Sequence, residues 1–183
     1  DLHLSDLDSS ALKEVETLDP TIKTKCFNVY DRDMLKSFLK PADVVLIAVP
    51  GHMGYELLEK IIDFKKNIVD ISFSPENILS LNKKAKDNNI TVVFDAGLAP
   101  GIPNFLLGNI DAKENVKSFK YFVGGLPKHP KPPYNYKAPF SPIDVVEEYT
   151  RPARIMKNGK VITKPALTDI EKKIYQNTGM LEG

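Results

Sequence analysis

Two side chains capable of acid–base chemistry follow strand-like segments of the sequence. Asp95 ends the segment 90–95, and His52 follows the apolar segment 43–49. A carboxylate can attract an ammonium group and, where burial raises its pKa, accept the proton, while a histidine with a pKa of about 6.5 suits a general base. Each also has a plain structural interpretation, because Asp95 could accept backbone N–H bonds in its turn and His52 could only pack. We take both as candidate catalytic residues, with Asp95 preferred.

Glycines accompany both candidates. Pro50 ends a strand-like segment, and the following Gly51 lets the backbone approach a flat ligand closely. Gly97 and Gly101 permit tight backbone in the strand-to-helix connection after Asp95, where the helix start offers free N–H groups to an anion. The alternative at both places is an ordinary turn. The pattern favours ligand binding at the carboxyl ends of strands.

Asp6 ends the first strand-like segment. In dinucleotide-binding folds, an acid at this place accepts hydrogen bonds from the adenosine ribose and repels a 2′-phosphate, so it favours NAD over NADP. The alternative is that Asp6 or Asp8 only starts the next helix. None of the ten glycines forms the phosphate-binding pattern G-x-G-x-x-G. We interpret this as a chain that opens at the second strand of the fold; the alternative is a protein that binds no dinucleotide.

The elements expected to position these residues alternate between strands and helices. Strands are expected at 2–6, 25–30, 43–49, 67–71 and 90–95, and helices at 9–16, 33–39, 54–65, 75–87 and 101–109. Such alternation indicates a parallel sheet with right-handed crossovers. The apolar segment 43–49 is typical of a strand covered on both faces. The expected fold class for residues 1–115 is α/β, a Rossmann-type doubly wound parallel sheet whose first strand and glycine loop are missing.

A second, antiparallel-rich region is expected over residues 116–183. Residues 117–123 alternate like a strand, and Ser141-Pro142 marks a helix start. Asn158-Gly159 lies between two strand-like segments and is the strongest short hairpin signal. This region is interpreted as part of an α+β domain.

A polar cluster precedes the expected hairpin. It consists of Tyr149, Arg151 and Arg154. Because arginine pairs well with carboxylates, the cluster is a candidate site for a substrate carboxylate. The alternative is a solvated strand edge.

The overall composition narrows the choice of partners. The net charge of +1 gives no argument for nucleic acid or an anionic membrane. The longest apolar stretch, Val44–Pro50, is too short to span a bilayer, and no signal peptide is recognised, so we expect a cytoplasmic protein. The single Cys26 fits a reducing compartment. One cysteine and three scattered histidines lack the spacing of metal ligands, so no metal site is expected.

Several short motifs, taken in order, resemble the saccharopine dehydrogenase family. They are A-V-P-G at 48–51, V-D-I-S-F at 69–73, D-A-G-L-A-P-G at 95–101 followed by Asn104, V-G-G-L-P at 123–127, K-P-P at 131–133 and E-Y-T-R-P at 148–152. The resemblance covers roughly residues 2–168. It implies an NAD(P)-binding Rossmann domain, an α+β substrate and dimerisation domain, and therefore a homodimer. The activity it implies is hydride transfer from a carbon that bears an amine.

The resemblance also implies roles for individual residues. Cofactor contacts are expected at Asp6, Tyr30, Asp31, Val49, Pro50 and Ile71, and the glycine positions add Gly51 and Gly97. The nicotinamide and the amino-acid substrate are expected near His52, Asp70 and Asp95, with Asp70 a substrate ligand.

One residue of the motifs bears on the choice of substrate. Reductases that form saccharopine resemble this region but carry an acid where Ala99 stands, so the resemblance favours the lysine 6-dehydrogenase branch. We therefore expect an NAD-dependent enzyme that deaminates the ε-carbon of lysine to the semialdehyde. The alternatives are a dehydrogenase of saccharopine or of a carboxylated polyamine, and a truncated homologue without catalysis.

Overall fold

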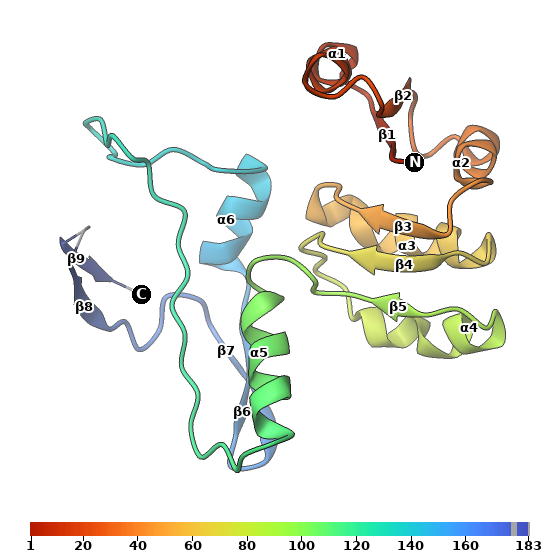
Figure 1. Ribbon diagram of the computed structural model, residues 1–183. Helices are drawn as coiled ribbons and strands as arrows, with labels where there is room; N and C mark the ends of the chain where they lie inside the picture. The colour runs from red at the N-terminus through yellow and green to blue at the C-terminus, as the bar shows by residue number, and fades with distance from the viewer. Residues whose placement is uncertain (177–178, 183) are drawn as a thin grey trace. The chain divides into compact units, whose positions relative to one another are not determined.

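Parallel strands followed by helices build the first part of the chain (Figure 1). The computed structural model describes residues 1–176 and 179–182, which divide into two units, Asp1–Gly101 and Ile102–Gly183. The strands of the first unit are β1 (His3–Asp6), β2 (Lys23–Cys26), β3 (Val44–Ile47), β4 (Asn67–Asp70) and β5 (Val92–Val93). Its helices are α1 (Ser9–Leu18), α2 (Arg32–Leu39), α3 (Gly51–Asp63), the short 3₁₀ helix η1 (Ile78–Leu81) and α4 (Asn82–Asp87). The expected α/β class with parallel pairing is confirmed.

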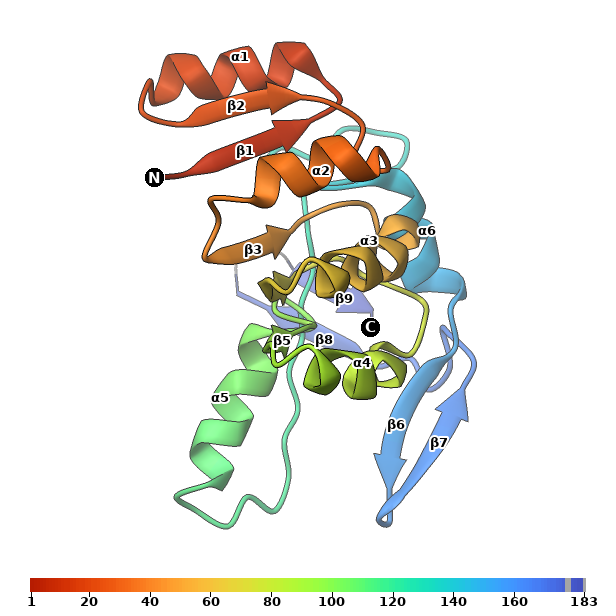
Figure 2. The same cartoon turned by 90° about the vertical axis from the view of Figure 1, so that its right-hand side faces the viewer.

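The strands of the first unit form two sheets. β1 pairs with β2, and β3, β4 and β5 pair in that order, all in parallel. β1 and β3 lie at the neighbouring edges of the two sheets, and among the described residues no strand pairs with both (Figure 2). A shared hydrophobic core joins the two sheets, because Phe27 after β2 belongs to the same buried cluster as Ile68 of β4.

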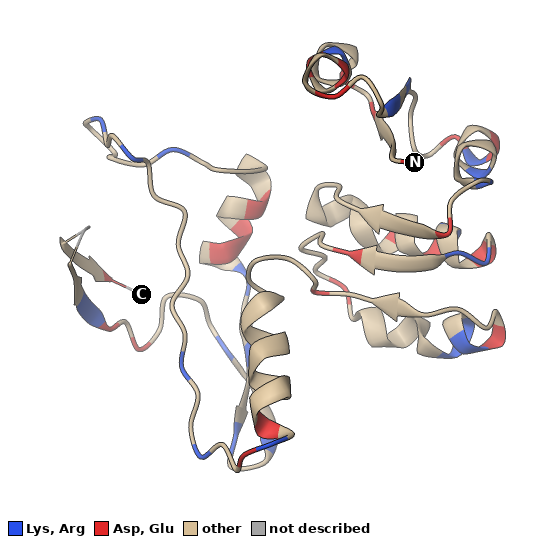
Figure 3. Ribbon diagram, viewed as in Figure 1, with Lys and Arg blue, Asp and Glu red and all other residues tan. Residues whose placement is uncertain are grey.

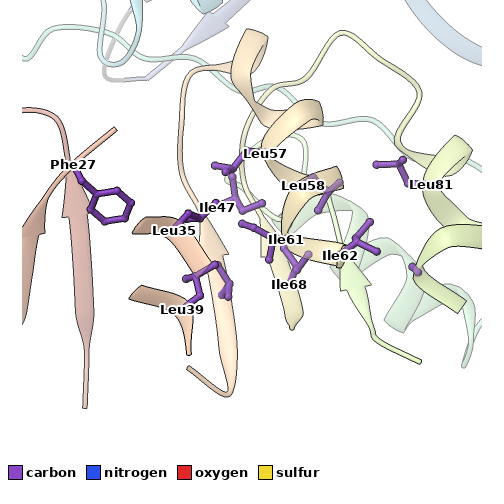
Figure 4. Close-up of a cluster of buried hydrophobic side chains, with 12 residues drawn as sticks. Phe27, Leu35, Leu39, Ile47, Leu57, Leu58, Ile61, Ile62, Ile68 and Leu81 are labelled. Atoms are coloured by element: carbon purple, nitrogen blue, oxygen red, sulfur yellow. The ribbon is translucent and has the colours of Figure 1, made fainter. Parts of the chain in front are cut away.

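The core lies between α3 and the sheet of β3 and β4. The apolar face of α3 consists of Leu57, Leu58, Ile61 and Ile62, and it packs on Ile47 and Ile68 (Figure 4). Full burial of a side chain of this size is worth about 1.5–3 kcal/mol, so these contacts hold α3 firmly on the sheet. The residues that follow each strand are thereby fixed in place.

One face of β3 stays open in the described chain. Val45 and Ile47 are buried under α3, whereas Val44 is 57% exposed and Leu46 is 62% exposed. The expectation that β3 is covered on both faces was wrong for these residues. Successive side chains of a strand point to opposite faces, and among the described residues none buries the second face.

The helix expected at 75–87 is broken into two. Asn77 accepts a hydrogen bond from the backbone N–H of Leu79 and starts η1, and α4 follows directly. The side chain of Asn77 thus competes as a helix cap with the Ser74-Pro75 start that the sequence predicts.

The second unit contains α5 (Ile102–Asp111), α6 (Pro142–Thr150) and two antiparallel hairpins. The hairpins are β6 (Ala153–Lys157) with β7 (Lys160–Lys164), and β8 (Lys172–Tyr175) with β9 (Gly179–Glu182). Asn158 and Gly159 turn the first hairpin with φ angles of 52° and 73°, and α6 follows Ser141, so both of these predictions are confirmed.

Residues 117–123, expected as a strand, have no regular structure. Phe119, Tyr121 and Phe122 all remain partly exposed there, and no strand within the described part of the chain pairs with this segment. Alternation alone does not make a strand, because the backbone needs a partner for its hydrogen bonds. The division into units after Gly101 places α5 with the second unit, and the domain change predicted near residue 116 stays a prediction.

Candidate active site

The carboxyl ends of β3, β4 and β5 meet at one edge of the parallel sheet. We call this edge, with the residues that follow each strand, the carboxyl edge. The N–H of Ile71 donates to the carbonyl of Ile47 at 3.0 Å, and the N–H of Ala96 donates to the carbonyl of Asp70 at 3.0 Å. These two bonds continue the strand pairing into the connecting segments. The predicted residues found along the carboxyl edge are Val49, Pro50, Gly51 and His52 after β3, Asp70 and Ile71 at β4, and Asp95 and Gly97 after β5.

Asp70 is the most enclosed charged residue at this edge, with 1% of its surface exposed. One of its carboxylate oxygens accepts the N–H of Ser72 at 2.8 Å and also the Ser72 hydroxyl. Burial raises the pKa of Asp70 above its ordinary value, the Ser72 bonds oppose that rise, and the charge of Asp95 adds to it. An enclosed carboxylate has little surface left for a ligand, so the structure does not favour the predicted substrate contact of Asp70.

Asp95 is presented differently, on a half-buried turn. Its φ is 50°, a left-handed conformation that aspartate tolerates better than most residues. Gly97 and Gly101 then close the loop through a parallel β-bridge. Gly101 has a φ of 148°, and a Cβ at this position would overlap the backbone of Gly97. The D-A-G-L-A-P-G motif therefore forms a tight loop that holds Asp95 at the carboxyl edge.

His52 lies in the first turn of α3 and is exposed. Pro50 precedes this helix as its N-cap residue without a side-chain cap, and Gly51 is buried where the helix begins. His52 thus belongs to the same edge as Asp95, and its side chain is open to a ligand.

The turn after β1 gives Asp6 a local role. Its carboxylate accepts the N–H of Asp8 at 2.8 Å, and Asp8 in turn caps α1 by accepting the N–H groups of Ser10 and Ala11. This arrangement supports the helix-starting interpretation of Asp6. A ribose contact by the same carboxylate remains a prediction.

Two further predicted cofactor residues also have contacts within the first unit. Asp31 caps α2 by accepting the N–H of Met34 at 3.0 Å. The ring of Tyr30 lies under the ammonium group of Lys60 of α3, 4.5 Å from the ring centre. Both contacts stabilise the segment between β2 and α2, and the predicted cofactor roles of Tyr30 and Asp31 are not tested by them.

The polar cluster of the second unit, Tyr149, Arg151 and Arg154, spans the end of α6 and the start of β6. The acidic residues of α6 are red in Figure 3. Arg151 donates from Nε to Glu147 at 3.0 Å, so part of its charge is already balanced. Tyr149 and Arg154 are exposed. Burial, and then the neighbouring Asp144, raise the pKa of Glu148. A carboxylate ligand in this cluster remains a prediction, for which Arg154 is the most accessible cation.

Two residues of the carboxyl edge were missed by sequence reasoning. They are Ser72, which bonds Asp70, and Gly54 of α3, where a Cβ would overlap the hydroxyl oxygens of Ser72 and Ser74. The Asp-x-Ser spacing inside V-D-I-S-F is a signal for the first, because such a serine can donate back to the aspartate. Gly54 had no comparable signal, since its role depends on how closely α3 approaches the segment after β4.

Across residues 1–176 and 179–182, no three His, Cys, Asp or Glu side chains gather in a way that could hold a metal ion. Over the same residues, no helix has the length and apolar character needed to cross a membrane.

Family comparisons match almost the whole chain. Residues 4–93 match the model of the saccharopine dehydrogenase NADP binding domain, and residues 97–182 match the model of the saccharopine dehydrogenase C-terminal domain. The junction between the two matches falls in the D-A-G-L-A-P-G loop. Both matched domains are domains of saccharopine dehydrogenase, and they follow one another along this chain.

Individual relatives agree with the family match. The alpha-aminoadipic semialdehyde synthase of Rattus norvegicus is 31% identical over 137 residues, which is 71% of this chain and 15% of the rat protein. The saccharopine dehydrogenase [NADP(+), L-glutamate-forming] of Pyricularia oryzae is 29% identical over 141 residues, 73% of this chain and 31% of that protein. This chain therefore spans less than a third of either relative.

A solved structure has the same fold. Apo saccharopine dehydrogenase (L-Glu forming) from Saccharomyces cerevisiae superposes with a TM-score of 0.67 at 23% identity, covering 97% of this chain and 42% of the yeast chain. The Rossmann-type fold class predicted from the sequence is confirmed by this likeness.

The comparisons correct the predicted cofactor. The matched domain is an NADP binding domain, and the fungal relatives are named for NADP(+), so the prediction of NAD with NADP less favoured was wrong. The prediction relied on Asp6 as a ribose ligand. In the structure the Asp6 carboxylate accepts the N–H of Asp8, the N-cap residue of α1, so its position is explained by the start of that helix.

The carboxyl edge fits the flat ring of a nicotinamide cofactor. Ile71 is 43% exposed there, beside Val49 and Pro50, which are half-buried. A Cβ on Gly97 would lie 3.2 Å from the carbonyl oxygen of Pro100 and 3.7 Å from that of Ile71, so glycine lets this loop pack closely against the segment after β4. Parallel sheets bind their ligands at this edge. Fold, edge and family matches agree, and the chain belongs to the saccharopine dehydrogenase family.

Proposed function

We propose that the protein containing this chain is an NADP-dependent dehydrogenase that oxidises the secondary amine of saccharopine and releases glutamate and a semialdehyde. The observation that carries this proposal is the half-buried Asp95, held by the Gly97–Gly101 loop at the carboxyl edge of a domain that matches the family's NADP binding domain. The names of the fungal relatives supply the substrate and the product.

The first requirement of the reaction is an amine without its proton, because an ammonium has no lone pair with which to form an imine. Alkyl amines have a pKa of about 10, so a protein group must take the proton at neutral pH. Asp95 is the proposed acceptor, because a half-buried carboxylate attracts the ammonium and can remove its proton. His52 is the alternative acceptor at the same edge.

NADP⁺, when bound, would supply in its nicotinamide ring the hydride acceptor that the side chains lack. Val49, Pro50, Gly51, Ile71 and Gly97 are the residues proposed to hold the ring. Asp95 then releases the amine proton to solvent, and its carboxylate takes a proton from a water molecule as that water adds to the imine carbon. Asp95 gives the proton to the nitrogen as the carbon–nitrogen bond breaks, so the nitrogen leaves with glutamate and the carbon becomes the aldehyde.

A second candidate substrate is lysine, whose ε-amine reacts by the same steps and releases ammonia. Ala99 is the observation in its favour, because the resemblance places an acid there in saccharopine-forming reductases. The two substrates differ in one carboxylated arm. A carboxylate-binding role for Tyr149, Arg151 and Arg154 of the second unit stays a prediction from the sequence. A homodimer and a cytoplasmic location also remain predictions.

The experiment uses the full-length protein. Reduction of NADP⁺ is followed with saccharopine or lysine as the substrate, and the product is assayed separately as glutamate and as ammonia. The proposal expects turnover of saccharopine with one glutamate formed for each NADPH. Turnover of lysine with ammonia release would replace it by the second candidate. If neither substrate is oxidised with NADP⁺, the proposal is wrong.

A further inference from the structure

Asp70 is linked to the proposed base, Asp95, in two ways. Its carbonyl accepts the N–H of Ala96, the residue directly after Asp95, at 3.0 Å. β5 is only two residues long, so this bond is an important tie between the Asp95 turn and the sheet. The charge of Asp95 also reaches the Asp70 carboxylate, where it opposes ionisation.

Ser72 and Gly54 fix the orientation of the Asp70 carboxylate. The N–H of Ser72 donates to it at 2.8 Å, and the Ser72 hydroxyl donates to the same oxygen. Asp70 and Ser72 are both buried. A Cβ on Gly54 would overlap the Ser72 hydroxyl, so glycine in α3 is what leaves room for this bond.

We infer that Asp70 is a positioning residue, which Ser72 and Gly54 lock in place and which sets the location and the electrostatic environment of the Asp95 carboxylate without touching the substrate. The inference rests on the proposed function, in which Asp95 is the base. It departs from the prediction that Asp70 is a substrate ligand, because an enclosed carboxylate that already accepts two hydrogen bonds serves better as a support.

Other titratable groups around Asp70 have their own contacts or lie in solvent. On α3, Tyr55 bonds Ser80 at 2.7 Å and Glu56 pairs with Lys60 at 2.7 Å, while His52 is exposed. β3 contributes apolar side chains to the core beside Asp70. A change in the charge of Asp70 is therefore expected to act mainly on the Asp95 carboxylate.

The test measures how Asp95 responds when Asp70 or its support is changed in the full-length protein. Asp70→Asn keeps an oxygen to accept the Ser72 bonds and removes the charge, and Ser72→Ala removes one bond and keeps the charge. Ser80→Ala is the matched control for Ser72→Ala, because it also loses one serine hydroxyl bond beside α3. The readouts are the pH profile of kcat/KM and the pH titration of the Asp95 carboxyl carbon by NMR.

Asp70→Asn is expected to lower kcat/KM about tenfold, a fraction of the ~10²-fold typical for losing acid–base catalysis. With the negative charge gone, the Asp95 titration and the acid limb of the profile should move to lower pH. Ser72→Ala should move both in part, and Ser80→Ala should move neither. KM for NADP⁺ should stay unchanged in all three variants.

The NMR titration separates this inference from the proposed function, because it needs no turnover. If the wild type oxidises no amine but the Asp95 titration still moves in Asp70→Asn, the function is wrong and the coupling stands. An unchanged Asp95 titration in both Asp70→Asn and Ser72→Ala overturns the inference. A rise in the substrate KM of Asp70→Asn at constant kcat also overturns it, because that result would mean that Asp70 binds the substrate. If Asp70→Asn does not fold, Ser72→Ala alone decides by the same readouts.

Discussion

Gly54 of α3 lies so close to Ser72 that a Cβ at position 54 would overlap the Ser72 hydroxyl. This contact joins the main core helix to the buried hydrogen bonds of Asp70. A glycine inside a helix usually lowers stability by about 0.5–1 kcal/mol relative to alanine, so its presence here has a packing reason. The effect of adding a Cβ at position 54 can be measured in the free energy of unfolding.

Gly54→Ala is expected to reduce the free energy of unfolding by about 1–3 kcal/mol, the usual cost of overpacking a core. Denaturant unfolding measures the change. Gly108→Ala in α5 is the matched control, because nothing lies within 4 Å of an added Cβ there, and alanine should stabilise that helix slightly. Equal effects of the two substitutions would mean that Gly54 has no special contact.

Asp95→Asn is expected to lower kcat/KM about 10²-fold or more, because the amide cannot accept the amine proton. Asparagine tolerates the φ of 50° at this position, so folding and NADPH affinity should change little. Steady-state kinetics and cofactor titration measure the two effects. If this variant keeps activity within about threefold of wild type while His52→Ala is inactive, the base is His52.

Asp6→Asn tests the corrected view of the β1 turn. The amide oxygen can still accept the N–H of Asp8, so α1 should start as before. We expect the full-length protein to bind NADPH more tightly than NADH, and the ratio of the two dissociation constants to change by less than about threefold in the variant. A large gain in NADPH affinity would show that the Asp6 carboxylate faces the 2′-phosphate.

The buried Asp70 should make stability depend on pH. Burial raises its pKa in the folded protein, so the folded protein holds this proton more tightly than the unfolded chain does. The stabilisation is therefore present at low pH and is lost as the pH rises from about 4, the unfolded value, through the folded pKa. Asp70→Asn removes this term, so its stability relative to wild type should improve between about pH 4 and pH 7. Denaturant unfolding at both pH values measures it, with the exposed Asp87→Asn as control.

A homodimer is expected for the full-length protein. The second unit exposes large apolar side chains, among them Phe105 and Leu106 of α5, and its hairpins are two-stranded with open edges in the described chain. Sedimentation equilibrium at micromolar concentration should give the mass of two chains. A monomer at every concentration would refute the expectation.

Local signals in the sequence determined much of the fold. Asn158-Gly159 is sufficient for a hairpin because both residues accept the positive φ that the turn requires. Pro142 after Ser141 starts α6 for an equally local reason. The alternation of strands and helices gave the α/β class, and the order of the short motifs gave the family.

Tertiary structure decided what each acid does. The sequence predicted Asp6, Asp70 and Asp95 alike to lie at or near the ends of strands. In the structure, Asp6 bonds the next turn, Asp70 is buried against Ser72, and Asp95 stays half-exposed on a tight loop. The burial of a carboxylate depends on which helix covers it and how closely, and the approach of α3 at Gly54 is set by packing between segments distant in sequence. Residue type and spacing alone do not contain that information.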